Sequence, residues 1–581
     1  MRNRAATLAP VALAAALIAA IPVRGNAAPG GSPAPADVLY VHGRIYTLDE
    51  RTPWASALAV RGERIAGVGS ESALAPLEGA RTRIVDLRGA FVMPGFTDVH
   101  VHLGMGGQYL TAIGLRDARS MAEVLHRVAA YAASHPHVAW IQGEAWSYGY
   151  PDLPGGQFHR ELLDRIVPDR PVFLDSSMAH AAWANSRALA LAGITRDTPD
   201  PPGGVIVRDA RGEPTGWLKE ASAMALVSRH IPPPTSAERR AALLAALQEA
   251  SRLGITRLDS AGFDFDALPT LAALERAGEL SARIEVADVI DPPGITREQL
   301  RALEAARARY HDDLLSVVAV KFFLDGVIES HTAYLPAGYA DDPRQRGLRF
   351  WDPPAYEAAV RTAAEHGFQV YTHAIGDGAI KLALDAYAQA NIATAGKPSL
   401  RHRIEHLEAP DPQDLPRLGE LGVIASMQPA MIYPRDQWQG MEGLWQRYAG
   451  ERFLATAFAL HTVLQDHAVL AFGTDWPVVD LNPLFGLRNA VLRQSLDHRP
   501  PGGYVPAERI SLSQALRAYT LDAAFASHRE QAEGSLVAGK LADFIILSRN
   551  IVESDPDRML EAHVLETVLG GRVVYRAAPA P

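Results

Sequence analysis

The feature that most constrains this chain is an alternation of short apolar segments with longer helical patterns, repeated eight times through its middle. The apolar segments are GFTDVHVHL, GITRLDSAG, ARIEVADVI, VVAVKFFLDG, FQVYTHAIGD, HRIEHLE, GVIASMQP and AVLAFGTDWP. Patterns rich in Ala, Leu and Arg lie between most of them, for example at 236–253, 354–366 and 380–391. Such an alternation predicts an α/β fold, a (β/α)8 TIM-like barrel whose strands are parallel.

Two further strand-like segments, AWIQGEAW and PVFLDSS, exceed the count of eight. Both lie between the first and second barrel strands, so we expect an insertion of about 104–235 at this point. It should be partly helical and partly strand, with a Gly/Pro-rich part at TPDPPGGVIVRDARGEPTG. Loops on this face of a barrel shape its active site.

The two ends of the mature chain share a different texture. Residues 37–92 and 531–577 hold short β-branched runs separated by glycines, which is the pattern of strands and hairpin turns. We expect them to form one small β-sandwich domain built from both termini, flanking a barrel at 93–530.

The first 28 residues resemble an export signal. Arg2 and Arg4 make a basic start, an apolar run covers 11–21, and small residues surround Ala27 and Ala28. The run is short for a membrane-spanning helix, so we expect cleavage near Ala28 and no stable membrane insertion afterwards. The prediction is an exported protein, periplasmic or secreted; an uncleaved anchor is the alternative.

Composition narrows the chemistry. The chain has no cysteine, which excludes disulfides and thiolate ligands, so a metal would be held by His, Asp, Glu or a modified Lys. The net charge is −10 and Lys and Arg are scattered, which argues against nucleic acid as a partner. The expected partner is a small-molecule substrate, and a homodimer stays open.

Residues that can bind a metal or move a proton mark five of the eight predicted strands. They are His100 and His102 on the first, Lys321 on the fourth, His373 on the fifth, His406 on the sixth and Asp475 on the eighth. The carboxyl ends of parallel barrel strands meet at one rim, so these side chains should converge there. The sequence therefore predicts a metal site at that rim.

The chain closely resembles the amidohydrolase superfamily, and within it the amidohydrolase-3 branch, which includes N-substituted formamide deformylase. The resemblance runs from about residue 37 to 577. It rests on PGFTDVHVHL, HAAWANSRALALAGI, GGVIVRDARGEPTGWLKE, VKFFLDGVIESHTAYL, YTHAIGDGAI, RIEHLE, FGTDWPV and GSLVAGKLADFIIL, in the family's order.

The resemblance implies a role for each candidate. His100 and His102 would hold one metal ion, and His373 and His406 a second. Lys321 would be carboxylated and bridge the two ions, while Asp475 would both touch metal and act as the catalytic proton shuttle. Zn²⁺ suits these ligands, two per chain, with another divalent metal open.

The expected activity is metal-dependent hydrolysis of a non-peptide C–N bond, in an amide or an N-acyl or N-formyl amine, by a metal-bound hydroxide. A carbamate, ester or phosphotriester is the alternative substrate. A mononuclear iron oxygenase and a catalytically dead binding protein are rival readings. Candidate substrate contacts are His180, Glu329, His331, Gln428 and Tyr433; where many relatives have a histidine after the seventh strand, this chain has Met431.

Overall fold

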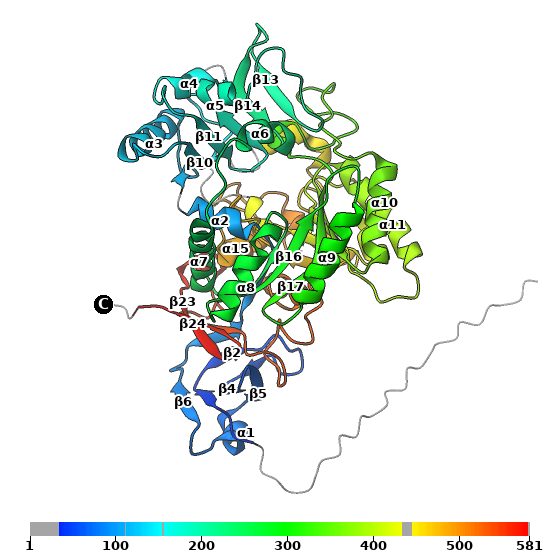
Figure 1. Ribbon diagram of the computed structural model, residues 1–581. Helices are drawn as coiled ribbons and strands as arrows, with labels where there is room; N and C mark the ends of the chain where they lie inside the picture. The colour runs from blue at the N-terminus through cyan, green and yellow to red at the C-terminus, as the bar shows by residue number, and fades with distance from the viewer. Residues whose placement is uncertain (1–33, 111, 154–155, 433–443, 579–581) are drawn as a thin grey trace, which may run out of the picture.

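The computed structural model describes residues 34–110, 112–153, 156–432 and 444–578. The predicted signal peptide, 1–28, lies outside these residues. Figure 1 shows three regions stacked along one axis: an inserted sheet at the top, the barrel in the middle and two smaller sheets at the bottom. Among the described residues, no helix is long and apolar enough to cross a membrane.

The eight predicted barrel strands are all present and lie in chain order in one parallel sheet. They are β8(Phe96–Val101), β15(Ile255–Ser260), β16(Arg283–Val289), β17(Leu315–Phe323), β18(Gln369–Ala374), β19(Arg403–His406), β20(Ile424–Met427) and β21(Leu470–Phe472). A parallel bridge between Val101 and Trp476 joins the first strand to the segment after the last. The predicted barrel is therefore confirmed.

A buried carboxylate fastens this seam between the first and last strands. Asp98 is fully buried and accepts hydrogen bonds from the backbone N–H of Thr474, at 3.0 Å, and of His100, at 3.1 Å. The hydroxyl of Thr474 donates to its second oxygen. Because one side chain binds both strands, the positions of His100 and of the segment leading to Asp475 are fixed together.

Helices cover the outside of the barrel and bury their apolar sides against it. They include α7(Ser236–Arg252), α8(Leu268–Arg276), α9(Arg297–Arg309), α10(Pro353–Glu365), α11(Asp377–Ala393), α12(Leu415–Leu421), α14(Leu460–Gln465), α15(Pro483–Leu492), α16(Leu512–Ala518) and α17(Leu521–Ala526). Helix α7 begins with a capping box, in which Thr235 and Glu238 bond each other's backbone N–H. Three of these helices match the predicted 236–253, 354–366 and 380–391 to within three residues at each end.

Between β8 and β15 the chain forms a separate six-stranded sheet, in the order β13-β14-β12-β11-β10-β9. After α2(Leu103–Tyr109) come β9(Ile113–Gly114), α3(Met121–Ser134), β10(Ile141–Trp146), α4(Arg160–Asp164), β11(Val172–Ser176), β12(Ala181–Ala184), α5(Ser186–Leu191), β13(Val205–Arg208), β14(Pro214–Lys219) and α6(Ala221–Ser228). It has hydrophobic clusters of its own on its two faces. We call it the inserted sheet.

Two carboxyl groups lie side by side where the inserted sheet meets the barrel. Glu144 on β10 and Asp175 on β11 are partners in the strand register and line a small cavity with Arg116 and Val478. Burial, followed by the charge of Asp175, raises the pKa of Glu144 to about 8. Burial raises the pKa of Asp175 to about 7.

Both ends of the described chain enter the lower region. The N-terminal part alone forms a four-stranded sheet of β5(Arg64–Gly69), β4(Ala57–Arg61), β1(Val38–Val41) and β6(Arg83–Asp86). A six-stranded sheet combines both ends, in the order β24(Arg572–Arg576), β23(Val564–Leu569), β22(Phe544–Leu547), β7(Phe91–Pro94), β2(Arg44–Tyr46) and β3(Trp54–Ala55). The two sheets share a core in which Tyr40 packs edge-on against Phe544 at 5.2 Å, as a sandwich requires.

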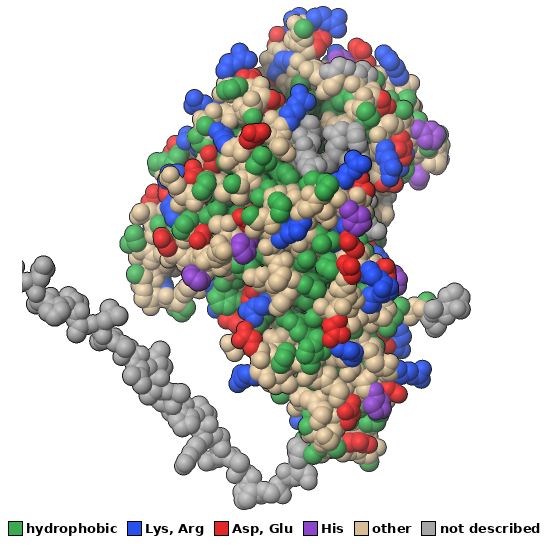
Figure 2. Space-filling model, turned by 180° about the vertical axis from the view of Figure 1, so that it is seen from behind, with side chains coloured by type: hydrophobic (Ala, Val, Ile, Leu, Met, Phe, Trp, Pro, Cys, Tyr) green, Lys and Arg blue, Asp and Glu red, His purple; other side chains and the backbone are tan. Residues whose placement is uncertain are grey.

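The barrel interior below the rim is charged. Arg257 donates to Asp259 at 3.0 Å and to Glu285 at 2.8 Å, and Arg403 donates to the other oxygen of Asp259 at 2.9 Å. All four side chains are fully buried. Each has a hydrogen-bonded partner of opposite charge, which offsets the cost of burying it. On the outside, acidic and basic side chains are interspersed over the face shown in Figure 2.

Candidate metal centre

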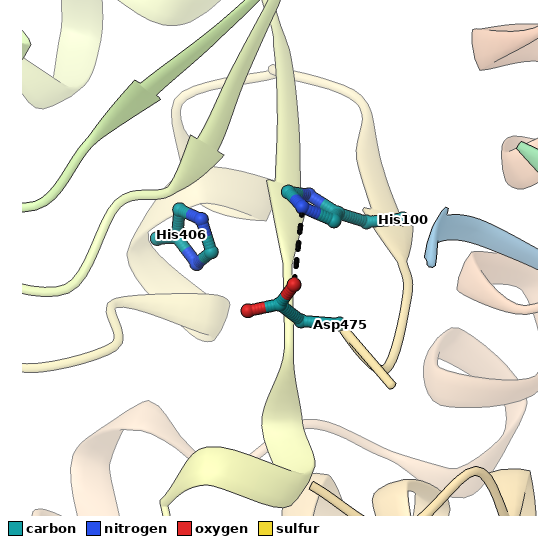
Figure 3. A group of neighbouring side chains, drawn as sticks. All are labelled: His100, His406 and Asp475. Atoms are coloured by element: carbon teal, nitrogen blue, oxygen red, sulfur yellow. Dashed lines mark ion pairs between the residues drawn. The ribbon is translucent and has the colours of Figure 1, made fainter. Parts of the chain in front are cut away.

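The six predicted metal residues all lie buried at the rim formed by the carboxyl ends of the barrel strands. In Figure 3, His100, His406 and Asp475 face one another across this rim. His406 and Asp475 have φ values of 75° and 60°, in a region that non-glycine residues rarely occupy. The strained backbone aims each side chain into the barrel where its strand ends, and strain of this kind gathers at functional sites.

On one side of the rim, Asp475 faces the two histidines of the first strand. Its Oδ1 atom lies 3.0 Å from His102 Nε2 and 3.3 Å from His100 Nε2. Burial raises the pKa of Asp475, but the two imidazoles outweigh burial and hold this pKa well below its ordinary value. A carboxylate and two imidazole nitrogens therefore converge here.

Lys321 lies close to histidines on both sides of the rim. Its side chain is 0% exposed, and its Nζ atom is 3.4 Å from His100 Nε2 and 4.9 Å from the centre of the Phe323 ring. Burial lowers the pKa of Lys321 to about 8. The neutral amine, which can react with CO₂ to form a carbamate, is therefore more accessible than in an exposed lysine.

On the other side of the rim, the rings of His373 and His406 are 4.4 Å apart, and His406 is 4.9 Å from His100. His373 Nε2 is bonded to the carbonyl oxygen of Gly326 at 3.1 Å, which leaves Nδ1 for a metal. Burial holds the pKa values of both histidines well below the ordinary range. Neighbouring cationic groups add to this effect: His406 lowers the pKa of His373, and Lys321 is among the groups that lower the pKa of His406. Neutral imidazole is the form that binds metal.

These residues fit a metal ion by geometry and by chemistry. One ligand atom each from His100, His406 and Asp475 lie within 4.8 Å of one another. His406 Nδ1 is buried without a hydrogen-bond partner in the described structure. Imidazole nitrogens and one carboxylate are a donor set that zinc accepts. A carboxylated lysine would add a second negatively charged oxygen ligand.

A carboxylate that the sequence analysis missed, Glu405, orients one of the histidines. Its Oε2 atom is 2.6 Å from His100 Nδ1 and also accepts from the hydroxyl of Ser426. A carboxylate at one ring nitrogen fixes the tautomer that presents the other nitrogen to a metal. Strand alternation would place Glu405 and His406 on opposite faces; the left-handed backbone at His406 brings both inside.

Two candidate substrate contacts lie beside the histidines. The ring of His180 is 5.0 Å from that of His373, and its Nδ1 atom is 2.7 Å from Glu220 Oε2. Gln428 is fully buried, with Nε2 at 3.3 Å from His100 Nδ1. Gln428 thus contacts a histidine that the metal prediction already uses.

The other three candidates differ in position. Glu329 has an oxygen that is buried without a partner, and burial raises the pKa of its carboxyl group to about 7. His331 is engaged elsewhere: its Nε2 atom pairs with Asp341 at 3.0 Å and its ring packs on Tyr448 at 4.1 Å. Tyr433 lies outside the described residues.

Comparison with known proteins identifies the family. The amidohydrolase family model matches residues 83–575. The chain belongs to the amidohydrolase family. This amidohydrolase is 34% identical over 549 residues to Protein LONG AFTER FAR-RED 3 of Arabidopsis thaliana, covering 93% of this chain and 92% of that protein. It is 27% identical over 546 residues to the N-substituted formamide deformylase of Arthrobacter pascens, covering 93% and 98%.

Solved structures agree with the family assignment. A crystal structure of an uncharacterized metal-dependent hydrolase from Pyrococcus furiosus superposes with a TM-score of 0.67 at 29% identity, covering 89% of this chain and all of that one. The amidohydrolase is therefore a metal-dependent hydrolase that acts on small molecules. The predicted family, fold and hydrolase class are confirmed.

Proposed function

We propose that this amidohydrolase holds two Zn²⁺ ions and hydrolyses the C–N bond of an amide or of an N-acyl or N-formyl amine. His100, His102 and Asp475 would hold one ion, and His373 and His406 the other. The observation that carries this proposal is the placement of Lys321, fully buried with Nζ 3.4 Å from His100 and close enough to His373 and His406 for its charge to lower their pKa values. As a carbamate it would offer an oxygen to each ion, which an ammonium cannot do.

The protein side chains have distinct tasks in this reaction. When bound, the metal ions would lower the pKa of a water molecule and polarise the substrate carbonyl. Asp475, whose Oδ1 lies between His100 and His102, is placed to take a proton from the attacking water and pass it to the departing amine. Glu405 keeps His100 in the tautomer that binds metal.

The substrate class is supported by similarity. The Arthrobacter pascens relative, similar over nearly its whole length, is named for the deformylation of N-substituted formamides. An N-formyl or N-acyl amine is therefore our first choice for this chain. A carbamate, an ester or a phosphotriester would use the same groups, and we retain them as the second choice.

Two measurements test the proposal. Metal analysis of the purified protein should give about two zinc ions per chain, with both ions lost after chelation. Hydrolysis of matched N-formyl, N-acyl, carbamate, ester and phosphotriester compounds should be fastest for the first two and should disappear with chelator. A single iron per chain, or ester hydrolysis that is faster than any C–N cleavage, would contradict this reading.

We also propose that the protein is exported and loses its first 28 residues. The support is the basic, apolar and small-residue pattern of that segment. N-terminal sequencing of protein from the natural source should begin after the Ala27–Ala28 region. Recovery of intact Met1 from the cytoplasm would contradict the proposal.

A further inference from the structure

The inserted sheet places two polar residues, His180 and Glu220, beside His373 of the candidate metal centre. Strands β12 and β14 pair so that Ala181 lies opposite Lys219, and His180 and Glu220 are the next residues at this end of the ladder. The backbone N–H of Glu220 donates to the carbonyl of His180 at 2.9 Å, and the side chains meet at 2.7 Å between Nδ1 and Oε2. The pair is therefore held by both backbone and side chain.

The backbone around this pair is strained. Ala179, just before His180, has a φ of 56°, and Glu220 has a φ of 67°, although neither is glycine. Such conformations cost of order 1–3 kcal/mol each and persist where the surroundings impose them. Glu220 is also only 2% exposed, and its buried carboxylate has His180 as a hydrogen-bonded partner.

Contacts with the barrel fix the pair against the rim. Lys219 Nζ donates to the carbonyl of Ser330, on the segment after β17, at 2.9 Å. Gly326 has no room for a side chain, because a Cβ atom there would lie 2.3 Å from Glu220 Oε1. The same Gly326 accepts the hydrogen bond from His373, so Glu220 touches the residue that orients a predicted metal ligand.

The imidazole rings form a row across the rim. His406 lies 4.9 Å from His100, His373 lies 4.4 Å from His406, and His180 ends the row at 5.0 Å from His373. Asp475 contacts His100. A substrate held over the metal ions would therefore lie close to both Asp475 and His180.

We propose that His180 is a catalytic residue that hydrogen-bonds the amide group of the substrate through Nε2, and that Glu220 is the positioning residue that holds it. Nδ1 is occupied by Glu220, so Nε2 is the ring nitrogen left for a ligand. The inserted sheet thus supplies one wall of the active site. This inference rests on the proposed C–N hydrolysis and adds the contact that recognises the amide group.

Kinetics of the metal-loaded full-length protein test the inference with the variants H180N, E220Q and the control H230N. His230 is an exposed histidine of the same inserted segment. On the N-formyl amine that the parent hydrolyses fastest, H180N should lose roughly 10²-fold in kcat/KM, the usual effect of removing one donor or acceptor at a reacting amide. E220Q should lose about 10-fold, since it misplaces the ring without removing it. H230N should match the parent.

Metal content and a binding measurement separate this role from structural ones. H180N and E220Q should keep the parent's zinc content and thermal unfolding temperature. Acetohydroxamate, which binds zinc through its two oxygens, carries an amide-like N–H and carbonyl and needs no turnover, should bind zinc-loaded H180N about 10-fold more weakly than zinc-loaded H230N in calorimetry. Zinc loss parallel to the loss of activity would make His180 a metal ligand and overturn the inference.

Equal kcat/KM in H180N and H230N would also overturn it. If the zinc-loaded parent cleaves no C–N substrate, the proposed function fails and the catalytic role of His180 fails with it. Acetohydroxamate binding then tests the ligand contact by itself: weaker binding to H180N supports that contact, and equal binding refutes it.

Discussion

Replacement of Glu405 by glutamine tests how far the buried carboxylate controls the metal centre. Glu405 is 0% exposed, and its Oε2 lies 2.6 Å from His100 Nδ1. Glutamine preserves the shape but not the charge, so the anionic acceptor that fixes the proton on Nδ1 becomes a weaker neutral one. Loss of such a partner typically lowers metal affinity 10- to 100-fold, or about 1.4–2.8 kcal/mol at 1.4 kcal/mol per factor of ten.

The assay is a titration of metal-free protein in zinc buffers of defined free concentration, following bound metal and activity together. For E405Q both curves should shift to 10- to 100-fold higher free zinc, with most activity recovered at saturation because Asp475 and His180 are untouched. Ser426→Ala removes only a hydroxyl that donates to the same carboxylate, so its shift should be smaller. If E405Q binds zinc as tightly as the parent, Glu405 does not act through His100.

Three other predictions concern separate parts of the molecule. Asp475→Asn should lower kcat by roughly 10²–10⁴-fold with metal content near that of the parent, because the base is lost while the other ligands remain; near-parent turnover would exclude the proton-shuttle role. Metal-free protein in CO₂-free buffer should regain activity faster with zinc and bicarbonate than with zinc alone, since a pKa of about 8 leaves about a tenth of Lys321 as free amine at pH 7; recovery independent of bicarbonate would argue against a carbamate. Glu144 binds its proton more tightly in the folded chain, with a pKa of about 8, than at its ordinary value of 4.5, so it lowers stability progressively as the pH rises between these values. Glu144→Gln should therefore gain about 4 kcal/mol relative to the parent in urea unfolding at pH 8.5 compared with pH 5, at about 1.4 kcal/mol per pKa unit; an equal difference at both pH values would refute this.

Local patterns in the sequence predict most of the barrel strands and the residues at their rim. Alternating apolar residues indicate each strand, and the positions of His100, Lys321 and Asp475 at or near strand ends predict that they lie at the rim. Glu405 was missed because strand alternation places it on the face opposite to His406, and the sequence does not reveal the left-handed backbone that turns His406 to the same side. The pairing of His180 with Glu220 could not be predicted for another reason. It depends on the register of β12 and β14, two strands of a sheet whose order does not follow the chain.

His331 is a candidate that the sequence suggested and the structure engages with other residues. Its position shortly after the Lys321 strand made it a candidate substrate contact, and in the structure its ring pairs with Asp341 and packs on Tyr448. The direction of a side chain after a strand depends on the path of the loop, here through a left-handed residue with φ of 60°. That path is set by tertiary contacts.

The shared sheet of the two chain ends has a consequence for biosynthesis. Strand β7 pairs with β22, whose residues lie about 450 positions later in the chain. At synthesis rates of about 5–20 residues per second, β7 emerges roughly 20–90 s before its partner exists. The barrel seam likewise joins Asp98 to Thr474. The six-stranded lower sheet cannot form until β22 has been made, and the barrel cannot close until the segment around Thr474 has been made. The strand edges that these late segments cover therefore stay exposed in the nascent chain for that time.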